Sequence, residues 1–180
     1  MNIHLEPFGR SDFRRLIRWV SNAEFMLLWS GPYFTFPLNE TQLEAYLQSA
    51  EGVPPPRKIF KAVNRETGEV VGHIELNMID WKNLSGMVSK VLVGYENRRG
   101  NGIGTQMMQR LIEVAFEDLG LHRLSLYVFD FNEPAINCYK KVGFKIEGHL
   151  RDFRKAGNNR YYSSYLMALL QPDWLQENAK

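Results

Sequence analysis

The segment NRRGNGIGTQMMQRL (97–111) decides the fold, because it joins a cluster of glycines to a run of helix-forming residues. Gly100, Gly102 and Gly104 stand on alternate positions, and glycine loses more backbone entropy on folding than any other residue. Such a cluster needs a conformational reason or a close contact. Upstream, MVSKVLV (87–93) is short, apolar and rich in valine, which is typical of a strand. The pattern predicts a strand, a glycine loop and a helix whose bare N-terminal N–H groups can bind an anion.

The spacing of these glycines differs from that of two common phosphate-binding loops. A P-loop requires Gly-Lys after four intervening residues, but the fifth position after Gly100 is Thr105. A dinucleotide-binding loop requires a third glycine three residues after the second, where this chain has Thr105 or Met107. What remains is the pattern Arg-x-x-Gly-x-Gly, and a plain turn before a helix is the alternative to an anion-binding loop.

The chain of 180 residues has the length and composition of one globular domain, which we expect to span residues 1–180. The net charge of +2 comes from scattered basic residues, which argues against a nucleic-acid or anionic-membrane partner. Cys138 is the single cysteine, so an internal disulfide is excluded and a reducing compartment is indicated. We expect Cys138 to be a core residue and not a nucleophile. No apolar run approaches membrane-spanning length, so a soluble cytoplasmic protein without a membrane partner is expected.

Hydrophobic periodicity and capping residues predict an α+β fold, a mixed sheet with helices packed on it. Ser11 and Asn39 are expected to cap helices, and Gly120 to end the helix after the glycine loop. The segment SAEGVPPPRK (49–58) is expected to be a surface connection. Expected helices lie in 11–20, 22–29, 39–50, between the glycine loop and Gly120, and in 132–143. Expected strands lie at 2–8, twice in 58–80 around a Thr67-Gly68 turn, at 87–93, at 122–130 and at 161–170, where the last strand closes the chain.

Four stretches of the sequence carry a resemblance to a known family. The glycine loop is followed by FNEPAINCYKKVGFKIEG (131–148), with an asparagine, an Ala-Ile helix, a tyrosine and Gly-Phe in order. These two motifs resemble the acyl-CoA pyrophosphate loop and the second signature of the GNAT superfamily of N-acetyltransferases. The tail GHLRDFRKAGNNRYYSSYLMALL (148–170) and VVGHIEL (70–76) resemble one branch of it. That branch contains the ribosomal-protein N-terminal acetyltransferases RimJ and RimL and the spermidine acetyltransferase.

The resemblance implies a mostly antiparallel twisted sheet, splayed between the strand before the glycine loop and the next strand. In such folds the pantetheine arm of acetyl-CoA lies in the splay, where backbone groups of Val91, Leu92 and Val93 would pair with it. Asn132 is expected to bond the pantetheine or its phosphate end, with a helix N-cap as a compatible alternative. The diphosphate is expected at the bare N–H groups of Arg99, Gly100, Asn101, Gly102, Ile103, Gly104 and Thr105.

The implied reaction is the transfer of an acetyl group from acetyl-CoA to a primary amine by direct attack in a ternary complex. The reaction needs a neutral amine, a polarised carbonyl and a proton for the departing thiolate. Tyr139 lies where the family places a side chain beside the CoA sulfur, and a phenol with a pKa of about 10 stays protonated at neutral pH. Packing is the alternative role for Tyr139, since Ile136 and Val142 share its helical stripe.

The general base is a separate problem, because the strand at 87–93 carries no glutamate. Glu75 on the preceding strand is the best candidate, acting directly or through water, and Asp80 is a weaker one. An ion pair of Glu75 with Lys90 or Arg123 is an equally good alternative. The four histidines show no metal-ligand spacing, so no metal is expected.

The aromatic stretch FMLLWSGPYFTFPL (25–38) indicates the acceptor side, because the family walls its acceptor site with the equivalent region. Trp29, Tyr33 and Phe34 can attract an ammonium group through cation–π contacts, and simple packing is the alternative. The expected partner is a small-molecule or peptide amine. A protein N-terminus, a polyamine, an aminoglycoside and a metabolite amine stay open, as does a homodimer.

Two other functions compete with the acetyltransferase. One is a catalytically silent acyl-CoA-binding or sensing module on the same fold, which the missing obvious base keeps open. The other is an unrelated anion-binding α+β domain. Thiol release from acetyl-CoA across a panel of amines would separate an enzyme from a sensor.

Overall fold

The sheet runs through the whole molecule, and its strand order brings the middle of the chain to the centre. The protein is described by a computed structural model over residues 2–94, 102–157 and 159–178. Neighbouring strands are antiparallel except for one parallel pair, β4 and β5, so the expected mixed, mostly antiparallel sheet is confirmed. In sheet order the strands are β1 (Ile3–Pro7), β2 (Lys58–Asn64), β3 (Val70–Asp80), β4 (Ser85–Val93), β5 (Arg123–Phe129), β7 (Tyr161–Leu170) and β6 (Lys145–Lys155).

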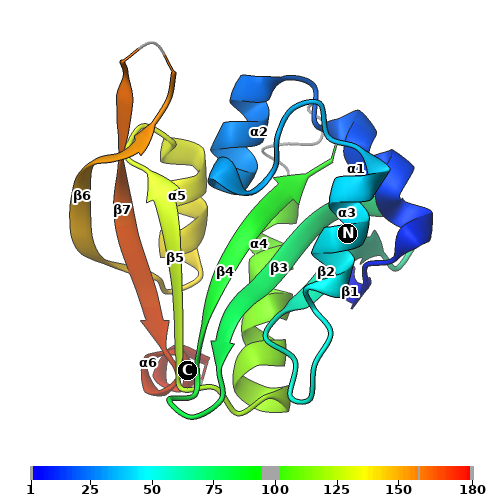
Figure 1. Cartoon of the computed structure of the whole chain (residues 1–180). Coiled ribbons are helices and arrows are strands. Elements are labelled where there is room, and N and C mark those ends of the chain that lie inside the picture. Colours follow the sequence, from blue (N-terminus) through cyan, green and yellow to red (C-terminus); the bar gives the residue numbers. More distant parts are fainter. Residues whose placement is uncertain (1, 95–101, 158, 179–180) are drawn as a thin grey trace.

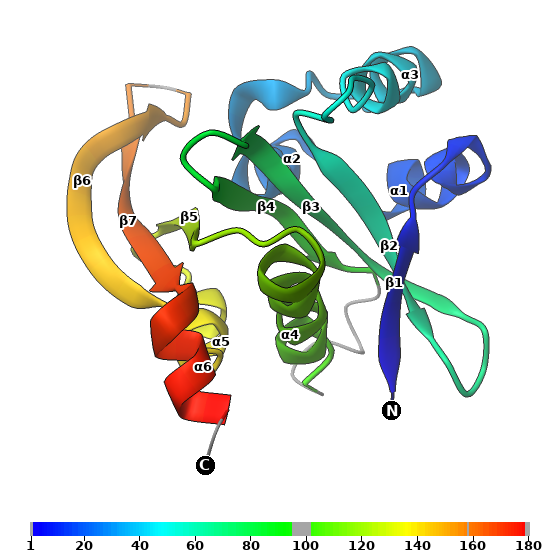
Figure 2. The same cartoon turned by 90° about the horizontal axis from the view of Figure 1, so that it is seen from below.

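Helices cover both faces of this sheet. Figure 2 shows α1 (Phe13–Trp19), α2 (Ala23–Ser30) and α3 (Glu40–Gln48) on one face, with α4 (Ile103–Glu113) and α5 (Glu133–Lys141) on the other. A last helix, α6 (Gln171–Asn178), follows β7. Asn22, Asn39 and Asn132 each cap a helix by accepting a hydrogen bond from a backbone N–H three residues on.

The periodic apolar residues form two buried clusters, one on each face. The stripe predicted after the glycine loop is buried against the sheet, as Met107, Met108, Leu111, Ile112 and Ala115. The opposite cluster joins α1, α2 and α3 to the sheet through Phe13, Leu16, Met26, Leu43, Tyr46 and Ile59.

A glycine on β3 sets how closely α4 approaches the sheet. A side chain at Gly72 would stand 2.5 Å from Met107 Sδ and 2.8 Å from the carbonyl oxygen of Leu92. Both distances are shorter than real carbon contacts, so a side chain here would have to displace the flexible end of Met107 and would meet the β4 backbone at Leu92, and glycine avoids both contacts.

The parallel strands β4 and β5 separate after a short common stretch. Residues 85–87 of β4 pair with residues 123–125 of β5, and the two strands then diverge (Figure 1). The predicted splay is therefore present. Along the divergent part the facing backbone groups of β4 and β5 have no strand between them, so other partners must satisfy them.

A β-bulge lies in the divergent part of β4. His73 pairs with Leu92 and Glu75 with Ser89, so two steps along β3 correspond to three along β4. The extra residue is accommodated at Lys90, which has a φ of 49°, an uncommon value for a residue with a side chain. Bulges bend a strand and redirect its side chains, and here the redirected side chain is that of Lys90.

Three sequence expectations about elements were wrong. Ser11 caps nothing, because the chain enters α1 through a short turn at 10–12 whose start is bonded by Asp12: the Gly9 N–H donates to Asp12 Oδ2. Strand β6 was not expected, and β7 does not close the chain, because α6 follows it. Both segments are rich in charged and exposed residues, and they are ordered by pairing with β7 and by packing of Trp174 on Phe116.

Within the described ranges, no helix has both the length and the apolarity needed to cross a bilayer. The cytoplasmic location and the homodimer stay predictions.

Candidate active site

A cleft of about 520 Å³ opens where β4 and β5 diverge. Its walls come from β4 and β5, from α2 with the turn that follows it, from α5, and from β6 and β7. Of the residues expected to act on cofactor or substrate, five line this cleft: Trp29, Tyr33, Val91, Asn132 and Tyr139.

The start of α4 has the bare backbone that an anion site requires. Gly102 is the N-cap residue with a φ of 75°, and apart from its chain neighbours no atom of the described residues lies within 4 Å of the place where a side chain would stand. Gly104 faces Cys138 and Val93 at ordinary contact distances, and Ile103 is buried. The sequence therefore leaves the helix N-terminus open on its solvent side. The expected residues Arg99, Gly100 and Asn101 lie outside the described part of the chain.

The three expected β4 residues differ in where their side chains lie. Val91 lines the cleft, Leu92 is buried under α1–α3, and Val93 packs against the core beneath α4. Their backbone groups toward β3 are paired as far as Val93. On the β5 side these residues face the open part of the cleft, which leaves their backbone available to a bound arm.

Helix α5 places two expected residues on the cleft wall. Asn132 caps the helix with its side-chain oxygen and also lines the cleft, so its two proposed roles are compatible. Tyr139 is buried, and burial raises the pKa of its phenol above the ordinary value. Its ring packs on Phe144, and its hydroxyl has no hydrogen-bond partner among the described residues. Tyr139 therefore lines the cleft as a buried phenol that stays protonated at neutral pH.

Cys138 lies beside Tyr139 in sequence but on another face of α5. Its sulfur stands 3.5 Å from Thr105 Oγ1 and joins α5 to the first turn of α4. Burial raises the pKa of this thiol, which keeps it protonated and unreactive.

Glu75 is completely buried, and three side chains bind its carboxylate. Ser89 Oγ donates to Glu75 Oε1 over 2.7 Å, and Lys90 Nζ lies 3.0 Å from the same oxygen. Arg57 Nη1 is 3.8 Å from the other oxygen. The ion pair with Lys90 that the sequence left open is present, whereas Arg123 instead pairs with Glu147 on the protein surface.

The pKa of Glu75 is lowered despite its burial. Burial alone would raise the pKa, but the charge of Lys90 and the hydrogen bonds from its neighbours outweigh that effect. Burial lowers the pKa of Lys90, and Glu75 opposes this shift. The two groups therefore stabilise each other's charge inside the protein, so Glu75 is ionised at neutral pH.

Two further polar side chains complete the buried group around Glu75. The Tyr46 hydroxyl lies 3.2 Å from His73 Nε2. Burial lowers the pKa of His73 to about 3, so this histidine is neutral. A neutral imidazole suits the aromatic rings of Phe8 and Trp29 that pack on it.

The aromatic residues expected at the acceptor site already surround an ammonium group. Lys90 Nζ stands 4.1 Å from the ring centre of Tyr33 and 5.9 Å from that of Phe34. Trp29 stacks on Phe34, and Trp29 and Tyr33 line the cleft while Phe34 is buried behind them. The cation–π contacts predicted for the acceptor are thus made, in the protein alone, by its own lysine.

The sequence analysis did not single out Ser89, Arg57 or Arg154 as site residues. A signal existed for Ser89, since Ser-Lys is a polar pair inside an otherwise apolar strand. No local pattern marks Arg57 or Arg154, because only the fold brings them to the cleft region. Asp80, the weaker base candidate, instead accepts hydrogen bonds from the backbone of Lys82 and Asn83 in the β3–β4 turn.

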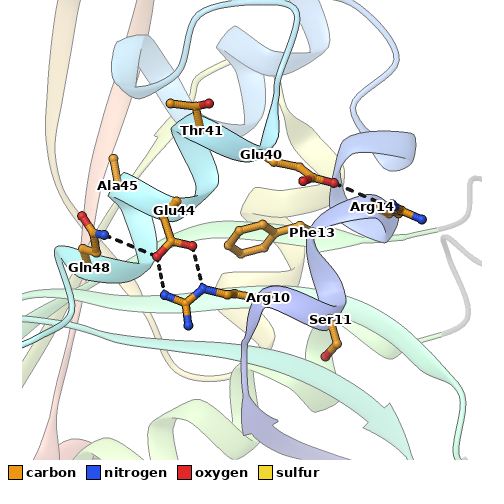
Figure 3. Close-up of a pocket in the computed structure, with 9 residues that line it drawn as sticks. All are labelled: Arg10, Ser11, Phe13, Arg14, Glu40, Thr41, Glu44, Ala45 and Gln48. Carbon is orange, nitrogen blue, oxygen red and sulfur yellow. Dashed lines mark hydrogen bonds and ion pairs between the residues drawn. The ribbon is translucent and has the colours of Figure 1, made fainter.

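A second hollow, of about 830 Å³, lies between α1 and α3 (Figure 3). Arg10 pairs with Glu44 across it, and Arg14 pairs with Glu40. Its charged groups are matched to one another on an open surface, and none of the expected cofactor or catalytic residues lines it. We therefore assign the chemistry to the cleft between β4 and β5.

Comparison with known proteins agrees with this geometry. Residues 23–144, more than half of the chain, match the Acetyltransferase (GNAT) family. The chain belongs to this family. The membership makes the protein an N-acetyltransferase with acetyl-CoA as its co-substrate.

Individual relatives are distant but extend along most of the chain. The uncharacterized N-acetyltransferase p20 of Bacillus licheniformis is 29% identical over 157 residues, covering 81% of this chain and 85% of the relative. Spermidine N(1)-acetyltransferase of Escherichia coli K12 is 25% identical and covers 98% and 90%. The crystal structure of spermidine N-acetyltransferase from Vibrio cholerae in complex with CoA and spermine superposes with a TM-score of 0.82 at 23% identity, covering 97% and 98%. At this identity the superposition supports the fold alone.

The buried pair of Glu75 and Lys90 should show strong coupling in stability. Lys90→Met removes the nearer of the two cations beside the buried carboxylate and leaves Arg57 at 3.8 Å, and we expect it to cost about 3–5 kcal/mol in unfolding free energy. Adding Glu75→Gln removes that charge, so the double variant should regain part of the loss. Denaturant unfolding measures all three proteins. Arg123→Met breaks an exposed pair and should cost about 1 kcal/mol or less.

The Glu75–Lys90 pair also determines how the stability of the fold changes at acid pH. Because the pKa of Glu75 is lower in the folded than in the unfolded protein, its stabilisation is complete above the ordinary value of 4.5 and is lost as pH falls through the folded pKa. The double variant should therefore lose less stability on acidification than the wild type. Additive effects of the two substitutions, or identical acid dependence, would contradict the coupling.

Proposed function

We propose that the protein transfers the acetyl group of acetyl-CoA to a primary amine within the cleft between β4 and β5. One observation carries the proposal: the open end of α4 and the hydroxyl of Tyr139 flank the same divergence of the two strands. The helix end supplies N–H donors for the diphosphate, and the divergent backbone supplies partners for the pantetheine arm. Asn132 stands at the wall of the cleft as a further polar contact.

In this proposal Tyr139 protonates the departing sulfur. The amine nitrogen attacks the thioester carbonyl carbon, the C–S bond breaks, and the electron pair on sulfur takes the phenolic proton. The raised pKa of Tyr139 keeps that proton in place at neutral pH. The resulting tyrosinate is reprotonated by solvent before the next turnover.

Glu75 is proposed as the base, acting through Ser89. Glu75 itself is buried below the cleft, but the hydroxyl of Ser89, which donates to it, lines the cleft. An amine proton can pass to Ser89 Oγ as the serine proton passes to the carboxylate. The lowered pKa of Glu75 keeps the carboxylate ionised at neutral pH, so its oxygen is free of a proton when the amine arrives.

The catalytically silent alternative is not favoured. A sensor would need the bare helix end and the divergent strands, but it would have no use for a buried phenol on the cleft wall. β4 carries no glutamate, but in this proposal Glu75 of β3 supplies the carboxylate through Ser89, so the absence of a β4 glutamate does not argue for a sensor.

Gly102→Val should abolish binding of acetyl-CoA. The side chain would cover the open helix end, although the positive φ of Gly102 also makes any substitution strained. Gly120→Val is the matched control, because Gly120 has a φ of 63°, an equally open position and a place at the other end of the helical segment. Acetyl-CoA should raise the melting temperature of the wild type and of Gly120→Val, but not of Gly102→Val. Equal shifts in all three would contradict the loop assignment.

Tyr139→Phe should slow the chemical step by about 10²-fold or more, because it deletes the proton donor and keeps the ring. Acetyl-CoA affinity should be nearly unchanged, since the diphosphate is held elsewhere. Single-turnover rates at saturating acetyl-CoA measure the effect. Tyr165→Phe removes a hydroxyl outside the cleft and should leave the rate unchanged. A Tyr139→Phe rate equal to that of the wild type would make Tyr139 a packing residue.

Ser89→Ala should lower kcat/KM by about 10-fold or more while leaving the Glu75–Lys90 pair in place. The loss should shrink at high pH, where more of the amine is already neutral. Ser125→Ala is the control, because Ser125 bonds the carbonyl of Gly86 on the other strand and does not line the cleft. If the pH–rate profile of Ser89→Ala follows that of the wild type, water is the base and the relay is wrong.

A further inference from the structure

The charged side chains that line the cleft, among the residues that the structure describes, all carry the same sign. Among the described residues that line it, the charged side chains are Lys90 and Arg154, and both are cations. No aspartate or glutamate of the described chain is among them. The nearby buried group has one carboxylate, Glu75, against two cations, Lys90 and Arg57. The acceptor side of the cleft therefore repels additional positive charge.

Lys90 has no free capacity for a ligand of opposite charge. Its ammonium is bound to Glu75 and enclosed by the rings of Tyr33 and Tyr46, 4.1 and 5.0 Å away. Only 5% of the residue is exposed. Lys90 thus fills the position in which an acceptor's ammonium could have met aromatic rings and a carboxylate.

Arg154 is in the opposite situation. It is half-buried on β6, and its guanidinium carbon stands 4.2 Å from the ring centre of Phe153. The ring centres of Phe153 and of Tyr127 on β5 are 4.9 Å apart, and this contact holds β6 against the cleft wall. Among the described residues Arg154 has no ion pair and no side-chain hydrogen bond. An oriented guanidinium without a carboxylate partner is a receptor for an anion.

We propose that the acceptor is a primary amine bearing a carboxylate, of the amino-acid class, and that Arg154 binds this carboxylate. The inference rests on the proposed function and specifies its substrate. A guanidinium binds a carboxylate through two parallel hydrogen bonds, which fixes the orientation of the amine that the same molecule carries. A polycationic amine lacks the anion and would place a second ammonium in a cleft that offers it no free carboxylate.

Matched pairs of amines test the preference. Each pair consists of an amino acid and its decarboxylated product: L-phenylalanine and phenethylamine, L-leucine and 3-methylbutylamine, L-lysine and cadaverine, with spermidine as the polycation. Thiol release gives kcat/KM, and calorimetry on the protein–CoA complex gives affinity without turnover. We expect at least one carboxylated member to exceed its partner, and spermidine, by about 10-fold or more in both measurements. The inference is overturned if no carboxylated member does so.

Substitution of Arg154 separates recognition from intrinsic reactivity. An α-carboxylate also lowers the pKa of its own amine, so the decisive quantity is how the ratio within a pair changes with the protein. Arg154→Gln should reduce the ratio of kcat/KM within a pair by about 10-fold, because kcat/KM falls for the carboxylated member only. Arg154→Lys should retain part of the preference for the carboxylated member. Lys155→Gln removes the same charge from the next residue, which is exposed and does not line the cleft, and should change nothing.

Three results would reject the role of Arg154. These are equal losses for both members of a pair, an equal effect of Lys155→Gln, and a loss of CoA affinity in Arg154→Gln, which would assign the residue to a phosphate. The inference and the proposed function can fail separately. Carboxylate-selective binding without thiol release would refute the function and keep the inference, and acetylation without carboxylate preference would do the reverse.

Discussion

The structure depends on two neighbouring strands that share only three residue pairs. β4 and β5 are held together at 85–87 and 123–125 and then part, which leaves two rows of backbone groups facing one another without a strand between them. Buried backbone N–H and C=O groups need hydrogen-bond partners. A ligand with its own amide groups can supply them along the divergent strands. The pantetheine arm of acetyl-CoA is such a ligand. The cleft follows from this divergence, and Figure 1 shows α5 beside the separating strands.

The bulge in β4 adds a second constraint, which is electrostatic. It turns Lys90 inward onto Glu75, so a carboxylate and an ammonium are buried together under the acceptor side of the cleft. Each charge is tolerable only because of the other, and the aromatic rings around Lys90 add favourable contacts. The pair therefore keeps an ionised carboxylate next to the cleft and also withdraws that carboxylate from direct contact with a cationic acceptor. The relatives named as spermidine acetyltransferases share the fold with this chain. Their low sequence identity does not imply that they share the Glu75–Lys90 pair.

Local sequence signals predicted the elements that have a buried face or a capping residue. The stripe from Met107 to Ala115 shows helical periodicity because α4 packs one side on the sheet, and Asn39 was recognised because its side chain replaces a missing backbone partner. β6 escaped prediction for the converse reason. It is an edge strand whose residues are mostly exposed, so its sequence carries no alternation, and only its pairing with β7 makes it a strand. α6 is ordered in the same way, by packing of Trp174 that no local pattern announces.

The sequence by itself determined the family-typical motifs, the helix that follows the glycine loop, the mixed sheet and the identities of Tyr139, Asn132 and Glu75 as residues worth testing. The elements follow from glycine conformation, hydrophobic period and short-range capping, all of which act over a few residues, whereas the roles expected of Tyr139 and Asn132 follow from the resemblance to the GNAT superfamily. The tertiary structure alone decided that Lys90 and not Arg123 would pair with Glu75, and that Ser89 would bond Glu75 at the cleft. It also decided that Arg154 would lie in the cleft wall with no ion pair to another described residue. Ion pairing and exposure depend on distances between residues from separate strands, and those distances exist only once the register of β3, the bulge of β4 and the pairing of β6 are in place.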